Sequence, residues 1–426
     1  MDRDQIAELA GFLKPIDRAE DNVLAQLDRT SDRVETDHAG RQVILERGRP
    51  LKTKLNIYRI MSLDSRLRDR YRYNEFSDEI WEDDHLLEDH HITELSLWLS
   101  RIYRVSIGKD PLYDLIIRRA RDNSYHPLQD YLKSLKWDKA DRIGSILQEY
   151  WGVEDRPLLR EIGLRWAISC VARGLRPGCK VDTVLILCGP QGAKKSTSLR
   201  VLAGDGYFSD SHLDIRSKDS YQLIHQSGVW IWELAEFYSL KNRDNENAKM
   251  FLSSPSDRYR PSYAKAPVKR QRSLVFTSTT NELAFLTDST GNRRYWPVNT
   301  GAIDIEGLRR DRDQIWAEAV YRFKNGERWW LEGDHETELQ EYQKSFVVDD
   351  PWVPSIQGLL SEFGDTGVLM DQIFDQLGLE KPYRNSGYAR RITAILQSIG
   401  AEQLRPSSHP MTTQKRPRVW RLKTNE

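Results

Sequence analysis

The sequence predicts an α/β protein built around a parallel β-sheet. Three short apolar runs carry this prediction: VLILC at 184–188, VWIW at 229–232 and SLVF at 273–276. Helical patterns separate these runs, and strands that alternate with helices are typical of parallel sheets with crossover connections. A glycine-bounded turn and a helix follow the first run, so we expect a loop to connect strand and helix there.

Composition limits the kinds of protein this chain can be. Its 426 residues leave room for about three domains. Lys and Arg number 64, as do Asp and Glu, so the net charge of zero excludes a uniformly basic protein and leaves only local basic patches. The three cysteines, Cys170, Cys179 and Cys188, form no C-x-x-C pair, which predicts a reduced, cytoplasmic protein without zinc. Neither a signal peptide nor an apolar run of about 18 residues is present, so we expect no membrane contact.

Four regions follow from changes of pattern along the chain. We expect a helix over 1–28, and then a polar linker with one short strand. The segment from Asn56 to Trp151 has helical spacing throughout. After Asp349, two helices and a basic β-ribbon favour a winged helix. The predicted boundaries are 1–54 for the N-terminal helix and linker, 55–175 for a helical domain, 176–349 for the parallel-sheet core and 350–426 for the winged-helix-like domain.

An acidic segment lies within the predicted helical region. EFSDEIWEDDHLLEDHHITE, at 75–94, has nine acids and no Lys or Arg. Two interpretations are open: a two-metal nuclease or primase site, or a solvated acidic loop that leads into a helix. The absence of a strand pattern around the acids favours the second. The candidate ligands are Asp83, Asp84, His85, Asp89, His90 and His91.

The segment GPQGAKKST, Gly189–Thr197, has the pattern of a phosphate-binding loop. Backbone N–H groups of such a loop, together with the helix N-terminus, cradle phosphates. We expect Lys195 to reach the β- and γ-phosphates of ATP and Ser196 to bind Mg²⁺. Lys194 stands where the usual pattern has glycine, and a positive φ there would cost about 1–2 kcal/mol. The alternative is a glycine-rich turn without a ligand. The predicted nucleotide-binding residues are Gly189, Gly192, Lys194, Lys195, Ser196 and Thr197.

Later segments supply candidate catalytic groups. Glu233 follows an apolar run and is expected to hold Mg²⁺, with Glu236 available to polarise the attacking water. Asn281 ends the third run and can sense the γ-phosphate. Arg293 and Arg294 follow a Thr-Gly-Asn turn and can stabilise transition-state charge from a neighbouring subunit. The alternatives are two helix-surface acids, an ordinary turn asparagine and structural ion pairs.

The order of these motifs resembles the virulence-associated E (VapE-like) family of phage and mobile-element proteins. The motifs are GPQGAKKST, WIWELAE, SPSDRYRPSYAKAPVKRQRSLVFTSTTN and TGNRRYWPV, and the likeness covers roughly residues 50–345. The resemblance implies a superfamily 3 helicase with an AAA+ P-loop core and a helical N-terminal collar. It gives Glu233 the Walker B role, Asn281 the sensor role, and Arg293 or Arg294 the finger role. The family commonly has glycine at the position of Lys194, which bears on turnover more than on nucleotide binding.

Two basic segments are candidate DNA-binding surfaces. In Ser256–Arg272 the resemblance implies a hairpin that points into a central pore, with Lys265 at its tip, and Tyr259 and Tyr263 could stack on bases. Lysine and arginine contacts to phosphates would be independent of sequence and sensitive to salt. The alternatives are a solvated loop and a C-terminal protein-docking domain. The predicted DNA-binding residues are Arg258, Arg260, Lys265, Lys269, Arg270, Arg390, Arg391, Arg416 and Arg418.

These observations predict an ATP- and Mg²⁺-dependent DNA helicase or translocase of a phage or mobile element. It would act on single- and double-stranded DNA as a homo-oligomer, expected to be a hexameric ring, with a primase or polymerase as a possible partner. One alternative is a nucleotide-gated DNA-binding protein that does not unwind DNA. Another is an anti-phage defence NTPase on the same scaffold.

Overall fold

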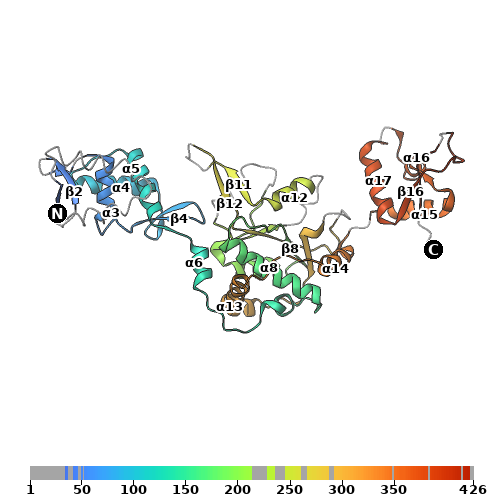
Figure 1. Ribbon diagram of the computed structural model, residues 1–426, viewed down its shortest axis with the longest axis horizontal. Coiled ribbons are helices and arrows are strands. Elements are labelled where there is room, and N and C mark those ends of the chain that lie inside the picture. Colours follow the sequence, from blue (N-terminus) through green and yellow to red (C-terminus); the bar gives the residue numbers. More distant parts are fainter. Residues whose placement is uncertain are drawn as a thin grey trace.

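A five-stranded, all-parallel β-sheet forms the centre of the protein (Figure 1). The computed structural model describes residues 34–36, 42–46, 49–50, 52–213, 228–235, 245–260, 266–286, 292–347, 350–381, 384–413 and 416–422. The strand order is β14-β8-β13-β10-β9, which confirms the predicted α/β class with a parallel sheet. The strands are β8 (Val184–Cys188), β9 (Phe208–Ser209), β10 (Ile231–Ala235), β13 (Val275–Thr280) and β14 (Tyr295–Asn299).

Both faces of this sheet are covered, which explains why its strands read as continuous apolar runs. Leu185 and Leu187 face one core, and Val184 and Ile186 face the other. On the first face, Trp230 packs against Trp316 with ring centroids 4.4 Å apart. The helices that contribute to the first core include α7 (Ile146–Trp151), α8 (Pro157–Leu175), α9 (Lys195–Ala203) and α13 (Ile305–Lys324), whereas α12 (Asn245–Ser253) covers the second.

The N-terminal region contains more β-structure than its sequence predicts. A four-stranded sheet, in the order β6-β5-β4-β7, lies within the segment expected to be entirely helical. Its strands are two to four residues long, too short to show an alternating pattern. The strands are β4 (Tyr71–Asn74), β5 (Glu79–Glu82), β6 (His85–Leu86) and β7 (Ser124–Tyr125); the helices are α3 (Lys54–Leu63), α4 (Asp89–Tyr103), α5 (Lys109–Asp122) and α6 (Pro127–Ser134).

The first 50 residues also differ from the expected linker. Instead of one short strand, the described part of this segment contains three, β1 (Val34–Thr36), β2 (Gln42–Glu46) and β3 (Arg49–Pro50), paired in chain order. The predicted helix over residues 1–28 lies outside the described residues. None of the helices in the described ranges is long and apolar enough to span a membrane.

An antiparallel hairpin, β11 (Ser256–Tyr259) and β12 (Val268–Gln271), precedes strand β13. A buried ion pair anchors it, because Arg272 Nε donates to Asp257 Oδ2 at 2.6 Å. The hairpin is also bonded to the N-terminal sheet. Tyr259 Oη donates to Asp78 Oδ2 at 2.9 Å, and Arg270 donates to Tyr73 Oη at 2.6 Å and to Asp78.

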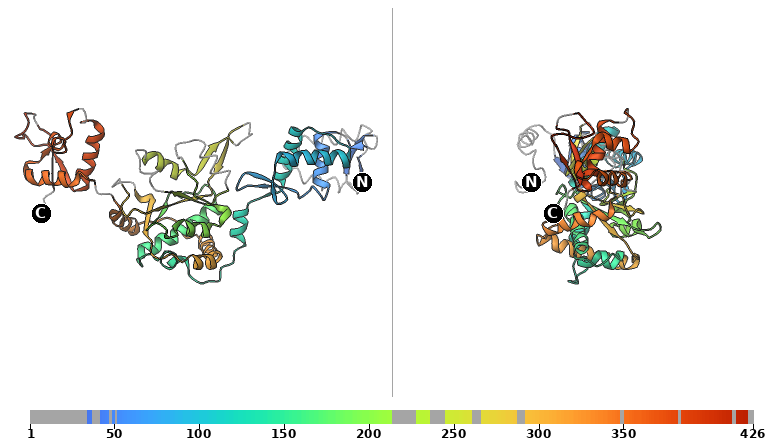
Figure 2. Two further views of the ribbon diagram at one scale, coloured as in Figure 1. Left: turned by 180° about the vertical axis from the view of Figure 1, so that it is seen from behind. Right: turned by 90° about the vertical axis from the view of Figure 1, so that its right-hand side faces the viewer.

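The C-terminal region forms its own small core, seen at one end of the molecule in Figure 2. The sequence predicts two helices and one strand, and the described residues contain three of each. The additional elements are one helix ahead of the predicted ones and two short strands. They are α15 (Val353–Phe363), β15 (Val368–Leu369), α16 (Met370–Gln376), α17 (Ser386–Ser398), β16 (Ala401–Leu404) and β17 (Val419–Leu422), with α14 (Asp334–Gln343) ahead of them.

Candidate functional site

Three chain segments meet at the carboxyl edge of the central sheet. The strands run parallel, so their carboxyl ends lie at one edge. Cys188 of β8 pairs with Thr280 of β13, which places the loop after β8 beside Asn281. Strand β10 lies on the other side of β13, with Glu233 opposite Thr277. The sheet order therefore brings the loop, the amide and the acid together across three adjacent strands.

The loop 189–194 contains two residues with positive φ. Gly192 has φ 80°. Lys194 has φ 62° and ψ 25°, and it caps the start of α9. The position before Lys195 therefore requires the left-handed conformation, and lysine adopts it at a cost of about 1–2 kcal/mol. The Lys194 side chain is exposed, whereas Gly189 is buried. A Cβ on Gly189 would lie 2.4 Å from Thr300 Oγ1, so this position has no room for a side chain.

Lys195 joins the loop to the end of β13. Its Nζ donates to Gly189 O at 2.7 Å, to Pro190 O at 2.9 Å and to Asn281 Oδ1 at 3.0 Å. Only 7% of the residue is exposed, and burial lowers the pKa of its ammonium below the ordinary value. All three acceptors are uncharged. An anion bound at the loop would therefore be stabilised by a positive charge that no direct contact neutralises.

Glu233 is buried with only one of its carboxylate oxygens bonded. Its Oε1 accepts from Ser196 Oγ at 2.8 Å and from Thr279 Oγ1 at 2.5 Å. Its Oε2 has no hydrogen-bond partner among the described residues, although Glu233 is only 1% exposed. A buried carboxylate oxygen without a donor is costly unless a cation or proton reaches it.

The donor set at Glu233 fits Mg²⁺. This ion prefers hard oxygen ligands and is usually held by one or two carboxylates together with substrate phosphates. Glu233 supplies the carboxylate and Ser196 the hydroxyl, 2.8 Å apart. In the described parts of the chain, no cluster of three His, Cys, Asp or Glu residues offers a complete protein cage.

Two contacts at this site were not predicted from the sequence. Thr279 lies two residues before Asn281 on β13, and its hydroxyl orients Glu233. Trp151 Nε1 donates to Ser198 Oγ at 2.7 Å and so fixes the first turn of α9. Period-two alternation along β13 could have placed Thr279 on the same face as Asn281. Thr197 is exposed, and Glu236 lies outside the described residues.

Arg293 and Arg294 lie at the opposite edge of the sheet from the loop. They directly precede β14, whose first residue, Tyr295, pairs with Val184 at the start of β8. The length of β8 corresponds to about 15 Å, so neither arginine is placed beside the loop of its own chain. Arg294 donates to Ser253 Oγ at 3.1 Å and lies 3.4 Å from Asp182 Oδ2. Arg293 is exposed and forms no hydrogen bond or ion pair with the described residues.

The predicted DNA-binding residues differ in their contacts and exposure, and Lys265 lies outside the described residues. Arg270 is bonded to the N-terminal sheet. Arg391 forms two bonds to Asp350, at 2.8 and 2.9 Å, and its guanidinium lies 3.8 Å from the centre of the Trp352 ring. These two arginines have structural partners. The exposed residues of the set are Arg258, Arg260, Lys269, Arg390, Arg416 and Arg418.

The acidic segment 75–94 is framed by strands, contrary to the expectation. Its buried member, Glu82, accepts from Tyr71 Oη at 3.1 Å and pairs with Arg70 Nε at 2.7 Å. Asp83 and Asp84 lie 3.7 and 3.8 Å from arginine side chains. Within the described residues these acids form no group of three that could hold a metal ion.

Comparison with known proteins gives one family match. The profile of the virulence-associated protein E-like domain matches residues 132–348. No match was found among curated proteins. An A form apo structure of the NrS-1 C terminal region-CTR is similar at 10% identity and a TM-score of 0.44, over 83% of this chain and 96% of that one. A second apo structure of the NrS-1 C terminal region (305-718) has 11% identity and a TM-score of 0.41, over 79% and 84%.

The left-handed backbone at Lys194 predicts a stability effect. Lys194→Gly should raise the free energy of unfolding by about 0.5–1 kcal/mol, because removing the Cβ relieves more strain than the added chain entropy costs. Lys194→Ala is the control, since it removes the charge and keeps the Cβ. Urea unfolding measures both. Equal stability of the two variants would show that the position carries no backbone strain.

The unbonded oxygen of Glu233 predicts that Mg²⁺ raises the thermal stability of the protein. Millimolar Mg²⁺ at constant ionic strength should raise the melting temperature of the wild type, because binding to the folded state stabilises it. Glu233→Gln should remove that rise and should melt no lower than the wild type without Mg²⁺, since a buried charge is gone.

The exposed acid variant Glu338→Gln is the matched control and should keep the response to Mg²⁺. An equal rise in wild type and Glu233→Gln would place the cation elsewhere.

Proposed function

The chain belongs to the virulence-associated protein E-like domain family, and on that premise we propose that it is an ATPase that acts on DNA. In this proposal the core is of the superfamily 3 helicase type with an AAA+ P-loop fold. The protein would use ATP hydrolysis to move along or melt DNA during replication of a phage or mobile element. The observation that carries the proposal is the meeting of Lys195, Ser196, Asn281 and the half-bonded Glu233 at one sheet edge.

The loop and Lys195 bind the triphosphate. Backbone N–H groups of the loop and of the first turn of α9 point to the space before the helix, where phosphates are stabilised. The Lys195 ammonium exchanges its contacts with Gly189 O and Pro190 O for phosphate oxygens. Because those carbonyls are neutral, a doubly charged phosphate is a stronger acceptor for the same donor.

Glu233 and Asn281 act on the γ-phosphate end. When bound, Mg²⁺ supplies a positive charge that neutralises the β- and γ-phosphates. Glu233 keeps Ser196 oriented through its bonded oxygen and offers the second oxygen to the site. The Asn281 amide, already within 3.0 Å of Lys195 Nζ, can hold a γ-phosphate oxygen or the attacking water. Burial of Lys195 and Glu233 strengthens the electrostatic interactions of these two residues.

The opposite placement of Arg293 favours a ring. A loop at one edge and an exposed arginine at the other are complementary surfaces for head-to-tail contact between copies, which closes into a ring when the rotation allows. Arg293 would then stabilise transition-state charge in the neighbouring site. Arg294 would hold the turn through Asp182 and Ser253.

Exposed basic residues give DNA two places to bind. Arg258 and Lys269 lie opposite one another on the β11–β12 hairpin, which precedes β13 at the same edge as Arg293. Arg390, Arg416 and Arg418 lie in the C-terminal region, which we propose to be a winged helix. Contacts of this kind to phosphates are independent of sequence and weaken with salt.

A second candidate is a nucleotide-gated DNA-binding protein with slow or absent hydrolysis. The strained Lys194 favours it, because it adds a second lysine and backbone strain beside the phosphates. The two candidates differ in turnover and in whether DNA stimulates it.

Steady-state ATPase activity, with and without single-stranded DNA, tests the proposal. The wild type should hydrolyse ATP with Mg²⁺ and respond to DNA. Lys195→Ala should lose about 10²-fold or more, because one buried charged donor to the phosphates is gone. Lys194→Gly is the matched control on the adjacent residue and should keep activity or raise it. ATP binding without DNA-stimulated turnover would favour the second candidate, and loss in Lys194→Gly but not Lys195→Ala would refute the loop register.

The position of Arg293 predicts activity shared between subunits. Arg293→Ala should lower turnover about 10³-fold or more, as expected for an arginine finger. Mixing Arg293→Ala chains with Lys195→Ala chains should restore part of the activity, since some interfaces then combine an intact loop with an intact arginine.

Arg294→Ala is the comparison variant, and it should lower the melting temperature because it loses two bonds. A protein that stays monomeric with ATP and DNA, yet hydrolyses normally, would rule out the ring.

A further inference from the structure

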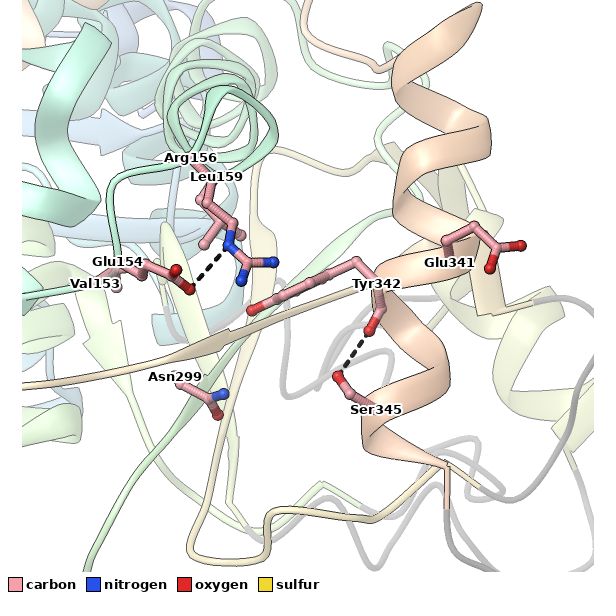
Figure 3. Close-up of a pocket in the computed structure, with 8 residues that line it drawn as sticks. All are labelled: Val153, Glu154, Arg156, Leu159, Asn299, Glu341, Tyr342 and Ser345. Carbon is pink, nitrogen blue, oxygen red and sulfur yellow. Dashed lines mark hydrogen bonds and ion pairs between the residues drawn. The ribbon is translucent and has the colours of Figure 1, made fainter.

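A pocket of about 350 Å³ opens at the end of β14 (Figure 3). Three distant segments build it: the residues that lead into α8, the end of β14, and the end of α14 with the turn after it. A volume of this size lies at the lower end of the range for small-molecule sites. The residues that line the pocket include Val153, Arg156, Leu159, Asn299, Tyr342 and Ser345.

The pocket lies at the same sheet edge as the loop, on the side of β8 where β14 lies. Asn299 pairs with Cys188, the residue directly before Gly189. Thr300 N donates to Cys188 O at 2.7 Å, which holds the chain after Asn299 against the start of the loop. Because neighbouring strands lie about 4.8 Å apart, one strand spacing separates Asn299 from the residue directly before the loop. Asn281 directly follows β13, and Glu233 lies on β10. Both strands are on the side of β8 away from the pocket.

We propose that this pocket binds the base of the nucleotide and selects a purine, with Tyr342 and Asn299 as its specificity-determining residues. The inference rests on the proposed function, because it requires a triphosphate at the loop. With the γ-phosphate toward Glu233 and Asn281, the remainder of the nucleotide must leave the loop on the flank where Asn299 and the pocket lie.

Tyr342 supplies a fixed aromatic surface. Figure 3 shows its side chain extending across the pocket toward Arg156. Behind it, Phe346 packs edge-on with ring centroids 5.2 Å apart. The next residue, Gln343, is buried and bonds Asn292 O at 2.8 Å and Tyr295 O at 2.5 Å, which ties the end of α14 to β14. The ring is therefore held before a ligand arrives, and purines offer it more area than pyrimidines.

The electrostatics suit a neutral base better than an anion. Burial raises the pKa of Tyr342 to about 12, so its phenol stays uncharged at neutral pH. Arg156 already pairs with Glu154, Nε to Oε2, at 2.9 Å. Val153 and Leu159 add apolar surface. A phosphate or carboxylate would meet Glu154 and gain no unpaired cation here.

Asn299 and Ser345 supply the polar contacts. The Asn299 amide carries both a donor and an acceptor and is exposed at the end of β14, so it can bond a base edge with both. Ser345 Oγ donates to Tyr342 O at 2.8 Å and keeps its lone pairs free to accept. An amide that donates and accepts together matches the edge of a purine such as adenine.

Equilibrium binding of ATP, CTP and inorganic tripolyphosphate, each with Mg²⁺, tests the inference on the full-length protein. The wild type should bind ATP at least about 10-fold more tightly than tripolyphosphate, since stacking of a base on an aromatic ring has that magnitude. It should also bind ATP more tightly than CTP, because the smaller pyrimidine covers less of the Tyr342 ring. Tyr342→Ala should remove most of this advantage and leave tripolyphosphate binding unchanged. Tyr342→Phe should keep it, because the ring remains.

Matched variants separate the pocket from general effects. Gln340→Ala changes an exposed residue of the same helix outside the pocket and should alter none of the three affinities. Asn299→Asp should weaken ATP more than tripolyphosphate, because it exchanges the amide donor for a charge.

Three outcomes would overturn the inference: equal wild-type affinity for ATP, CTP and tripolyphosphate; unchanged ATP binding in Tyr342→Ala; or parallel loss of ATP and tripolyphosphate in that variant. Failure of the proposed function is distinguishable, because the wild type would then bind neither ATP nor tripolyphosphate, or Lys195→Ala would bind both normally.

Discussion

The site depends on a carboxylate that the fold buries without satisfying it. Glu233 enters the centre of a sheet covered on both faces, and two hydroxyls, from Ser196 and Thr279, bond a single oxygen. The other oxygen has no partner in the described residues. Such a group lowers the stability of the protein without ligand, and a cation or a ligand that brings one recovers that loss. The sheet order places the loop and Lys195 close to Glu233, where a bound cation would neutralise the carboxylate.

Parallel strands give the core two unlike edges, and this polarity organises the rest of the molecule. The loop, Asn281 and the pocket at Tyr342 lie at the carboxyl edge, whereas the β11–β12 hairpin and Arg293 lie at the amino edge. Bonds from the hairpin to Asp78 join the amino edge to the N-terminal sheet. A movement of the hairpin would therefore break contacts with the N-terminal region, which gives that region a means to restrain it.

Features that depend on local sequence were predictable, and those that depend on distant contacts were not. The run VLILC and the spacing of Lys195 and Ser196 define a strand, a loop and a helix within a few residues. Glu233 and Asn281 could be placed because each follows an apolar run. The different contacts of Arg293 and Arg294 could not be predicted, since Asp182 and Ser253, which contact Arg294, lie far earlier in the chain. The small N-terminal sheet was missed because its strands are too short for a pattern, and the Tyr342 pocket because three distant segments form it.

The most direct test of the account is an experimental structure of the protein with Mg²⁺ and a non-hydrolysable ATP analogue. The account predicts β- and γ-phosphate oxygens within hydrogen-bonding distance of Lys195 Nζ and a metal ion in contact with Ser196 Oγ and Glu233. It also predicts that the direct bond between those two side chains, 2.8 Å without ligand, is replaced by their shared contact with the ion. An analogue bound away from the loop, or a loop occupied while Glu233 stays bonded only to Ser196 and Thr279, would contradict it.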